Sequence, residues 1–236
     1  MRPKGYFISG TDTGVGKTIV TACLLASYQK HGINTGFMKP IETGVDPECS
    51  SEANSDAKFL LEISGNQDNL EEVCPIRLKP AAAPLQAARM TNQSLDINLI
   101  MENFYKLQTR YDQMLVEGVG GLMVPIKPNY LVSDLIKDMQ LPLIIVSRVS
   151  LGTLNHTLLT LKMAQDIGIE IAGIILNSPR SEPLSEIESG QASLIQELSG
   201  LPVLGECPFI DPISAEQFDE KLAKKIGNWK ILPKIN

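Results

Sequence analysis

The sequence has little of what marks secreted, membrane-spanning or nucleic-acid-binding proteins. Its 236 residues include four cysteines, and no two of them have the close spacing of a metal site or a redox pair. No stretch approaches ~18 consecutive apolar residues, which excludes a membrane-spanning helix. The net charge of −6 comes without a basic stripe, which disfavours binding to nucleic acid. We therefore expect free thiols in a reducing cytoplasm, and no signal peptide ahead of the first strand.

The composition is that of one folded domain. Hydrophobic residues make up 43% of the chain and charged residues 20%, which is ordinary for a globular protein with a sizeable core. Single α/β domains often reach ~250 residues, so residues 1–236 are expected to form one domain rather than two. No internal repeat or low-complexity segment divides the chain.

Apolar runs alternate with helical patterns along the chain. Strands are predicted at residues 6–9, 35–38, 114–116, 143–147, 171–176 and 203–204. Helices are predicted at residues 17–31, 55–63, 95–109, 153–167, 186–198 and 214–226, with starts capped by Ser55, Ser94 and Ser214 and ends near Gly32 and Gly168. Apolar strands separated by helices predict an α/β fold with a doubly wound, mostly parallel sheet. The Pro- and Ala-rich residues 75–84 are predicted to form a long ordered loop, either functional or a plain connector.

The most informative segment runs from Gly10 to Thr18 and reads GTDTGVGKT. It lies between an apolar strand and an amphipathic helix, which is the setting of a phosphate-binding loop, or P-loop. Backbone N–H groups and the positive end of the helix dipole converge there on anionic oxygens. Lys17 can reach the terminal phosphates, and the Thr18 hydroxyl suits Mg²⁺. The segment therefore predicts P-loop NTPase architecture. The first glycine stands at position 10 instead of the usual position 11, which narrows the subfamily.

Polar residues follow several of the predicted strands. Lys39 follows the second strand, Glu117 the third and Asn177 the fifth, and Asp56 opens a helix. Ligands of such folds lie beyond the carboxyl ends of the strands, where these side chains should meet. Thr18, Asp56 and Glu117 offer the hard oxygen ligands that Mg²⁺ prefers. Lys39 offers a second cation for phosphoryl transfer, and the Asn177 amide suits a purine edge.

Each of these residues also has a plainer interpretation when taken alone. Asp56 suits the first turn of any helix, Glu117 is a charge before a glycine turn, and Lys39 is a solvated lysine. Their joint occurrence at the ligand edge of one nucleotide-binding fold favours a functional site.

Together these segments resemble the dethiobiotin synthetases, ATP-dependent enzymes of biotin synthesis. The resemblance is carried by residues 10–18, 39–44, 54–57, 80–84, 117–121, 148–156, 177 and 205–208, in the order found in that family. It extends from residue 5 to about residue 210, and the P-loop and the Leu-Gly-Thr-Leu-Asn-His segment at 151–156 are its most specific parts. The chain beyond residue 211 matches weakly.

The resemblance implies a ligase that carboxylates 7,8-diaminononanoate with CO2 or bicarbonate and closes a cyclic urea. ATP is the co-substrate, Mg²⁺ is held by Thr18, Asp56 and Glu117, and Lys17 and Lys39 are the catalytic residues. The implied ATP contacts are Thr13, Gly14, Val15, Gly16, Lys17, Thr18, Asp56, Glu117, Gly118, Val119, Gly120, Asn177, Ser178, Pro208, Phe209, Ile210 and Glu216. The implied substrate contacts are Thr11, Lys39, Thr43, Leu151, Gly152 and Asn155. A cytoplasmic homodimer with a substrate site at the subunit interface is also implied.

Three alternatives share parts of this pattern. Regulatory P-loop ATPases of the partition and division-site type resemble the chain, but they carry a lysine where this chain has Asp12. A glutamine-dependent amide ligase of cobalamin synthesis would need an added glutaminase domain, for which 236 residues leave no room. A non-enzymatic nucleotide-binding module would have no use for Lys39 and the two carboxylates.

Overall fold

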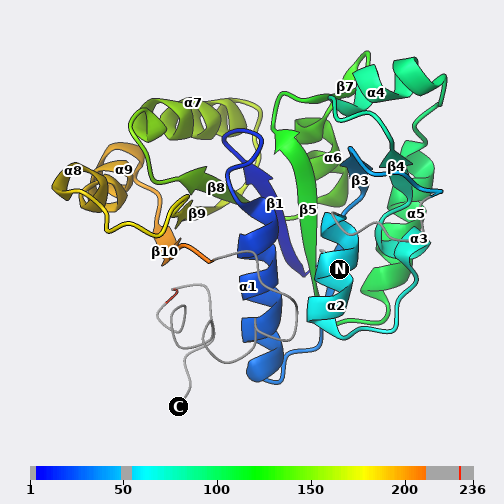
Figure 1. Cartoon of the computed structure of the whole chain (residues 1–236), viewed down its shortest axis with the longest axis horizontal. Coiled ribbons are helices and arrows are strands. Elements are labelled where there is room, and N and C mark those ends of the chain that lie inside the picture. The colour runs from blue at the N-terminus through cyan, green and yellow to red at the C-terminus, as the bar shows by residue number, and fades with distance from the viewer. Residues whose placement is uncertain (1–3, 49–54, 211–228, 230–236) are drawn as a thin grey trace.

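The computed structural model describes residues 4–48, 55–210 and 229, and its centre is a six-stranded sheet (Figure 1). Every pair of neighbouring strands in this sheet is parallel. In spatial order the strands are β2 (Thr35–Met38), β5 (Gln113–Gly121), β1 (Gly5–Gly10), β8 (Leu143–Arg148), β9 (Ile171–Asn177) and β10 (Val203–Cys207). Two small sheets accompany it, a parallel pair of β3 (Ile41–Thr43) with β4 (Ile76–Leu78) and an antiparallel pair of β6 (Pro125–Lys127) with β7 (Tyr130–Leu131).

Helices cover both faces of the central sheet, as the apolar strands predicted. They are α1 (Lys17–Lys30), α2 (Asp56–Ser64), α3 (Leu70–Val73), α4 (Pro84–Thr91), α5 (Ile97–Gln108), α6 (Val132–Met139), α7 (Thr153–Asp166), α8 (Glu186–Ser189) and α9 (Gln191–Ser199). In Figure 1, α1 and α2 lie side by side in front of the sheet, and α6 lies behind β5. Among the described helices, none is long and apolar enough to cross a membrane.

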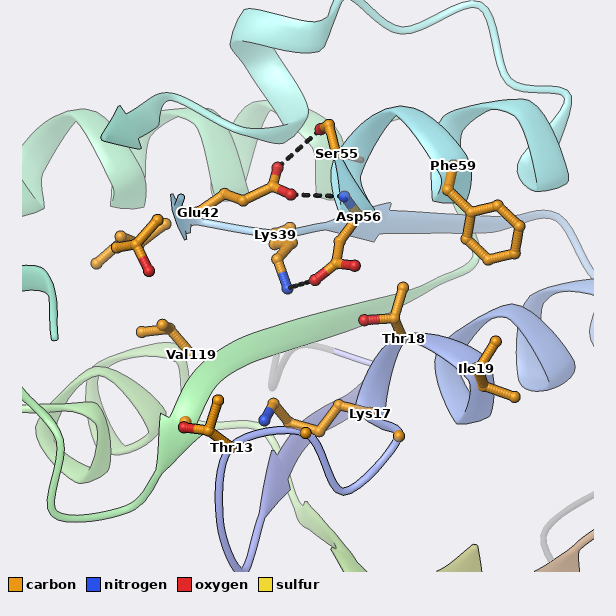
Figure 2. Close-up of a pocket in the computed structure, with 15 residues that line it drawn as sticks. Thr13, Lys17, Thr18, Ile19, Lys39, Glu42, Ser55, Asp56, Phe59 and Val119 are labelled. Atoms are coloured by element: carbon orange, nitrogen blue, oxygen red, sulfur yellow. Dashed lines mark hydrogen bonds and ion pairs between the residues drawn. The ribbon is translucent and has the colours of Figure 1, made fainter. Parts of the chain in front are cut away.

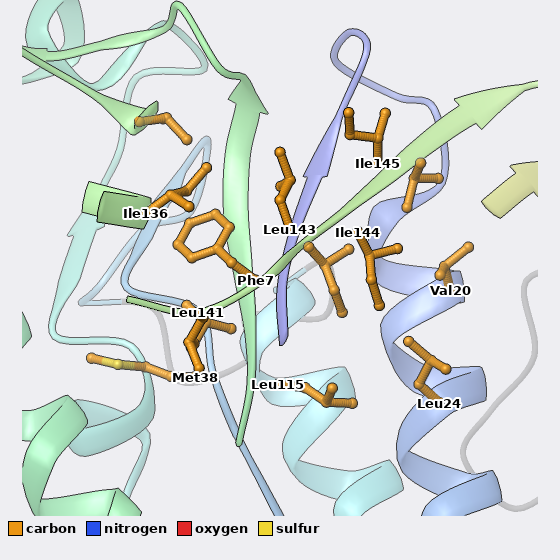
Figure 3. Packing of buried hydrophobic residues seen from close by; sticks show 14 of the residues in the cluster. Phe7, Val20, Leu24, Met38, Leu115, Ile136, Leu141, Leu143, Ile144 and Ile145 are labelled. Atoms are coloured by element: carbon orange, nitrogen blue, oxygen red, sulfur yellow. The ribbon is translucent and has the colours of Figure 1, made fainter. Parts of the chain in front are cut away.

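The core lies on both faces of β1 and β8. Successive residues of a strand point to opposite faces, so a strand covered on both sides is apolar throughout. Phe7 is directed toward Ile136 of α6, whereas Ile144 is directed toward Val20 of α1 (Figure 3). All four side chains are at most 1% exposed. Burying a side chain of this size contributes about 1.5–3 kcal/mol, so this packing fixes the sheet that carries the pocket.

The strand predictions are confirmed, with one change that affects the site. The strand predicted at 114–116 continues to Gly121, so Glu117 lies inside β5 rather than after it. The neighbouring strand β2 ends opposite Val116, which leaves Glu117 one residue beyond that end. Its side chain therefore lies at the carboxyl edge even though its backbone is still in the sheet.

The helix predictions are right in position and partly wrong at the ends. Ser55 caps α2 as predicted, but Asp96 rather than Ser94 caps α5, because its carboxylate accepts the N–H groups of Asn98 and Leu99. Gly32 and Gly168 follow the last residues of α1 and α7 with positive φ, as predicted. The helix predicted at 186–198 is divided at Gly190 into α8 and α9. Ser214 and the helix at 214–226 lie outside the described residues.

The predicted loop at 75–84 is wrong in part. Its first half forms β4, which pairs in parallel with β3, and its last residue, Pro84, starts α4. The helices α3, α4 and α6 were not predicted. Each has at most eight residues, which gives little helical periodicity to detect.

Trp229 packs against β10 where that strand has no side chain. A Cβ at Gly205 would lie 2.4 Å from the indole ring, so glycine is required for this contact. The indole N–H donates to the backbone oxygen of Glu206 at 3.3 Å, and the Trp229 residue is 5% exposed.

Candidate active site

A pocket of about 630 Å³ lies at the carboxyl edge of the central sheet (Figure 2). The P-loop forms one wall, and β3 with the start of α2 forms the opposite wall. The lining residues are Thr13, Gly14, Gly16, Lys17, Thr18, Ile19, Lys39, Ile41, Glu42, Thr43, Ser55, Asp56, Phe59, Val119 and Gly120. The edge predicted from the order of strands and helices is therefore the edge that carries the cavity.

The P-loop ends in a left-handed glycine that begins α1. Gly16 has φ 94°, and the helix start has no side-chain cap. The first residues of α1 line the pocket, so the N–H groups that a helix start leaves without internal partners are available to a ligand there. A Cβ at Gly16 would come within 2.1 Å of Asn177 Nδ2, so any other residue would have to displace that side chain. The Asn177 amide itself donates to Val15 O at 3.0 Å. Asn177 thus supports the P-loop from behind and does not line the pocket.

Lys17 is the P-loop cation, and its side chain reaches back over the loop. Its Nζ donates to the backbone oxygen of Asp12 at 3.4 Å, and the residue is 7% exposed. Burial lowers the pKa of Lys17, with Lys39 acting in the same direction and Glu117 opposing it. An ammonium that is short of partners in this position is suited to receive phosphate oxygens.

Lys39 lies at the floor of the pocket between two carboxylates. Its Nζ is 2.5 Å from Glu117 Oε1 and 2.9 Å from Asp56 Oδ2. Burial alone would lower the pKa of Lys39, but Glu117 and then Asp56 outweigh it, so the pKa lies above its ordinary value. Lys39 therefore carries a fixed positive charge and is not a proton acceptor at neutral pH.

Glu117 is fully buried and joins the P-loop helix to Lys39. Its Oε1 accepts hydrogen bonds from both Thr18 Oγ1, at 2.9 Å, and Lys39 Nζ. Its Oε2 has no hydrogen-bond partner within the described residues. A buried carboxylate oxygen without a donor is costly unless a cation or a ligand completes it.

These oxygens fit a magnesium site. Thr18 and Asp56 line the pocket with one hydroxyl and one carboxylate. Glu117 adds a buried carboxylate beside Thr18, and its Oε2 has no hydrogen-bond partner within the described residues. Among the described residues, no group of three or more His, Cys, Asp or Glu side chains could hold a metal. Mg²⁺ is commonly bound by one or two carboxylates with water and substrate phosphates, so this donor set suits a metal that arrives with a nucleotide.

Glu42 is a pocket residue whose role the sequence interpretation missed. It is 3% exposed and accepts hydrogen bonds from Ser55 Oγ and from the backbone N–H groups of Asp56 and Ala57. Burial raises the pKa of Glu42, and Lys39 opposes that shift. Ile19, Ile41, Ser55 and Phe59 also line the pocket without having been predicted as ligand contacts. The signal available for Glu42 was its place between Lys39 and Thr43 in a segment already singled out.

Several predicted contacts do not line this pocket. Thr11 is placed beside the Ser147 hydroxyl at 3.5 Å, and Gly118 packs its backbone against Phe7. Ser178 lies at the end of β9, where its N–H donates to Cys207 O, next to Pro208. Glu216 lies outside the described residues. The remaining predicted contacts that do not line the pocket are Val15, Glu117, Asn177, Pro208, Phe209, Ile210, Leu151, Gly152 and Asn155.

The predicted substrate contacts at the start of α7 are exposed. Leu151 is 94% exposed, Gly152 is the N-cap of α7 with φ 90°, and Asn155 is also exposed. Their helix start has no side-chain cap, and a network of hydroxyls from Thr153 and Thr157 through Ser147 lies beneath it. Thr11 connects this network to the P-loop.

Comparison with solved structures shows the fold. The MinC:MinD cell division protein complex of Aquifex aeolicus has a TM-score of 0.55 and 15% identity, over 89% of this chain and 82% of that chain. A ParA family ATPase from Chlorobium tepidum has a TM-score of 0.50 and 17% identity, over 99% and 93% of the two chains. At these identities the likeness extends to the nucleotide-binding fold and not to function.

Comparison with sequences shows the family. Residues 4–217 match a family described as AAA domain. The ATP-dependent dethiobiotin synthetase of Thermodesulfovibrio yellowstonii is 41% identical over 227 residues, which cover 93% of this chain and 95% of the relative. The same enzyme of Bacillus velezensis is 41% identical over 223 residues and covers 94% of both chains. With this identity along nearly its full length, the chain belongs to the ATP-dependent dethiobiotin synthetase family.

Proposed function

We propose that this protein carboxylates 7,8-diaminononanoate with CO2 and closes the product to dethiobiotin at the expense of ATP. The observation that carries the proposal is the buried Lys39 ammonium, which lies opposite the P-loop and is held by Asp56 (Figure 2) and by Glu117. A second fixed cation beyond Lys17 suits a reaction in which an anionic acceptor attacks the terminal phosphate of ATP. A pocket that only held nucleotide would have no need of it.

The proposed reaction has three steps. One amine of the diamine attacks CO2 and loses a proton, which gives a carbamate. A carbamate oxygen then attacks the γ-phosphorus of ATP. The bond between the γ-phosphorus and the β-phosphate oxygen breaks, ADP departs, and a carbamic–phosphoric anhydride remains. The second amine attacks the carbamic carbon, loses a proton and expels phosphate, and the five-membered cyclic urea is formed.

The charged residues of the pocket have separate roles in this proposal. Lys17 binds terminal phosphate oxygens from the P-loop side, and Lys39 neutralises the carbamate and the transferred phosphoryl group from the opposite side. Lys39 can do so because its carboxylate partners keep its pKa raised and its ammonium charged. Thr18, Asp56 and Glu117 would hold Mg²⁺, which when bound neutralises charge on the phosphates of ATP. Thr43, on the β3 wall, is assigned to the diamine.

The remaining ATP contacts are proposed from position along the same edge. Thr13, Gly14, Val15, Gly16, Gly118, Val119 and Gly120 belong to the two loops that surround the phosphate end of the pocket. Asn177, Ser178 and residues 208–210 lie at the adjacent ends of β9 and β10, where the base would extend. Glu216 completes the proposed set. We assign all of them to a single domain over residues 1–236.

The partition- and division-type alternative has no observation in its favour beyond the shared fold. It would place a lysine at position 12, where this chain has an aspartate. Asp12 Oδ1 accepts the N–H of Thr13 at 2.7 Å, and Asp12 Oδ2 lies 3.6 Å from Arg148. The position that would carry that lysine therefore has the opposite charge and stabilises the P-loop itself.

The test is product formation by the purified protein. With ATP, Mg²⁺, the diamine and ¹⁴C-bicarbonate, we expect ADP, phosphate and a labelled cyclic urea in equal amounts. Omission of the diamine or of bicarbonate should abolish ATP hydrolysis. Steady hydrolysis without the diamine, with no label in any product, would refute the synthetase function.

We also propose a cytoplasmic homodimer in which the start of α7 from one subunit completes the substrate site of the other. Leu151, Gly152 and Asn155 do not line the pocket of their own chain, and the uncapped start of α7 is suited to a carboxylate such as the tail of the diamine. The three described cysteines are free thiols, as is typical of a reducing compartment.

The dimer proposal can be tested by subunit complementation. Lys39→Ala and Asn155→Ala chains, each inactive alone, are mixed and allowed to exchange subunits. A site shared between subunits should regain activity in the mixed dimers, because one of their two sites is intact. No recovery, or a monomer by sedimentation, would contradict it.

A further inference from the structure

The start of α2 is closed by a carboxylate from another element. Glu42 Oε1 accepts the N–H of Asp56 at 2.5 Å, and Glu42 Oε2 accepts the N–H of Ala57 at 3.3 Å. The next N–H, that of Lys58, donates to Ser55 Oγ at 3.2 Å. Helices leave their first N–H groups without internal partners. In α2 the first three all have partners, and two of the three use Glu42.

The hydrogen bonds of Ser55 fix Glu42 in return. The Ser55 hydroxyl donates to Glu42 Oε2 at 2.9 Å while its oxygen accepts from Lys58, so the hydroxyl has one defined orientation. Burying a carboxylate is costly unless donors complete it, and the positive end of a helix favours an anion. These donors explain why a residue that is only 3% exposed can be a glutamate at this place.

Glu42 is hydrogen-bonded to the backbone of Asp56. Asp56 is the first residue of α2, and the hydrogen bond from its N–H anchors its backbone to β3. Its side chain then extends into the pocket, where Oδ2 is 2.9 Å from Lys39 Nζ (Figure 2). The Asp56 side chain is 46% exposed, so packing contributes little to its orientation.

We propose that Glu42 is a positioning residue that holds Asp56 against Lys39 and toward the metal carried by the nucleotide. The proposal rests on the proposed function for its link to turnover. The other part of the proposal, that Glu42 acts through Asp56, does not depend on the reaction and applies to any nucleotide bound in the pocket. The competing interpretation is that Glu42 only stabilises the start of a helix.

The test is a double-mutant cycle of Glu42→Gln and Asp56→Asn. Glutamine keeps the shape of Glu42 but turns an NH₂ group toward donors, so it cannot accept all of the bonds that the carboxylate accepts. The first readout is the Mg²⁺ concentration at which ADP binding to the full chain is half-maximally tightened, measured by titration calorimetry. Glu42→Gln should raise it about tenfold, as is typical when a group that orients a metal ligand is lost. In the Asp56→Asn background the same change should have no further effect.

The second readout is turnover. Glu42→Gln should lower kcat about tenfold with little change in KM for ATP, and the loss should again vanish in the Asp56→Asn background. Glu42→Asp, which keeps the charge and withdraws it by one methylene, should show the same dependence on Asp56 and serves if Glu42→Gln does not fold. If the wild-type protein did not convert the diamine, the proposed function would fail, yet the ADP titrations would still decide the role of Glu42.

The matched control is Asp96→Ala, which removes a capping carboxylate from α5, outside the pocket. It should lower the urea concentration at which the protein unfolds, without changing the Mg²⁺ dependence of ADP binding. The proposal is overturned if Glu42→Gln likewise affects only stability. It is also overturned if the effects of Glu42→Gln and Asp56→Asn simply multiply in the double variant.

Discussion

Two helices begin at the same pocket, and their first turns are completed in different ways. α1 begins after Gly16, which has no side chain and leaves the helix start without a side-chain cap. α2 begins after Ser55, and its first three N–H groups donate to Glu42 and Ser55. The first start is open, and the second is closed by the protein's own carboxylate.

Because of this difference, only one of the two helix starts is free to bind an anion. The start of any helix attracts anions, so two open starts facing one cavity would compete for phosphate. Closing α2 leaves the start of α1 as the open one of the two, which is where we propose that phosphate binds. It also places the carboxylate of Asp56, the first residue of α2, in the pocket, where we propose that it holds Mg²⁺. Lys39 lies between the two, joined to Thr18 of α1 through Glu117 and to α2 through Asp56.

The largest effect on turnover is expected from removing Lys39, which connects the two helix starts. Lys39→Ala should lower kcat for cyclic urea formation by about 10²–10³, the cost of losing one preorganised charge-stabilising group. ATP affinity should change much less, because Lys17 and the open start of α1 remain. Stopped-time product assays and ATP titration measure the two quantities. Lys106→Ala, which removes an exposed lysine on α5, is the control and should leave kcat unchanged. Equal losses of kcat and ATP affinity would show that Lys39 only binds nucleotide.

The next effect comes from obstructing the open start. Gly16→Ala forces a side chain into left-handed backbone, at a cost of about 1–2 kcal/mol. Its Cβ also overlaps Asn177 Nδ2 at 2.1 Å, which should lower stability further and weaken ATP binding. Urea unfolding of the ligand-free protein and ATP titration are the measurements.

Gly14→Ala distinguishes the cost of backbone strain from the cost of steric overlap with Asn177. Gly14 also has positive φ, 71°, but a Cβ there meets nothing within 4 Å. Gly14→Ala should therefore lose only the strain energy. Adding Asn177→Ala to Gly16→Ala should recover part of the stability that the overlap removes. A Gly16→Ala protein as stable as Gly14→Ala would contradict the predicted overlap.

A smaller effect is expected from weakening the closed start. Ser55→Ala removes one cap acceptor and should lower the free energy of unfolding by about 1 kcal/mol. Ser94→Ala is the matched control, because Asp96 caps α5 in its place, and it should change stability by less than ~0.5 kcal/mol. Urea denaturation of both variants distinguishes a serine that caps a helix from one that only precedes it.

The smallest effect concerns a charge outside both helix starts. Hydrogen bonds from Arg110 and Lys106 lower the pKa of Glu72 from 4.5 to about 2. A lowered carboxyl pKa contributes stability above the unfolded value, and this contribution is lost as pH falls toward the folded value. Wild type should thus lose stability between about pH 4.5 and about pH 2 more steeply than Glu72→Gln. ATP affinity at neutral pH should be the same in both, and parallel acid titrations of stability would contradict the prediction.

The open start was predictable from the sequence, whereas only the Ser55 cap of the closed start was. The P-loop is one continuous segment whose glycines, lysine and threonine act in chain order, so its pattern is local. Lys39, Asp56 and Glu117 could also be placed together, because the carboxyl ends of parallel strands share one edge. Glu42 could not be assigned, because its partners are two backbone N–H groups, a hydroxyl and a thiol, none of which forms a recognisable sequence pattern with it. Only the packing of β3 against α2 brings them together.

The contrast between local and tertiary signals also explains which other elements were predicted correctly and which were not. The apolar strands 6–9 and 143–147 were found because burial on both faces leaves a continuous apolar run. Ser94 and Asp96 are both acceptable caps by residue type, and the choice between them depends on where tertiary contacts start the helix. The division of the last described helix at Gly190 lies within a pattern that is helical on both sides, so periodicity alone predicts one helix.

The contact between Trp229 and Gly205 gives the protein a built-in optical probe. The chain has one tryptophan, so its intrinsic emission under selective excitation comes from a single place. That indole is 5% exposed and hydrogen-bonded to Glu206 O on β10, next to the strand end where nucleotide contacts are proposed. Release of Trp229 into water would shift the emission to the red. Fluorescence can therefore follow, without any label, whether this position stays docked on β10 while ligands bind.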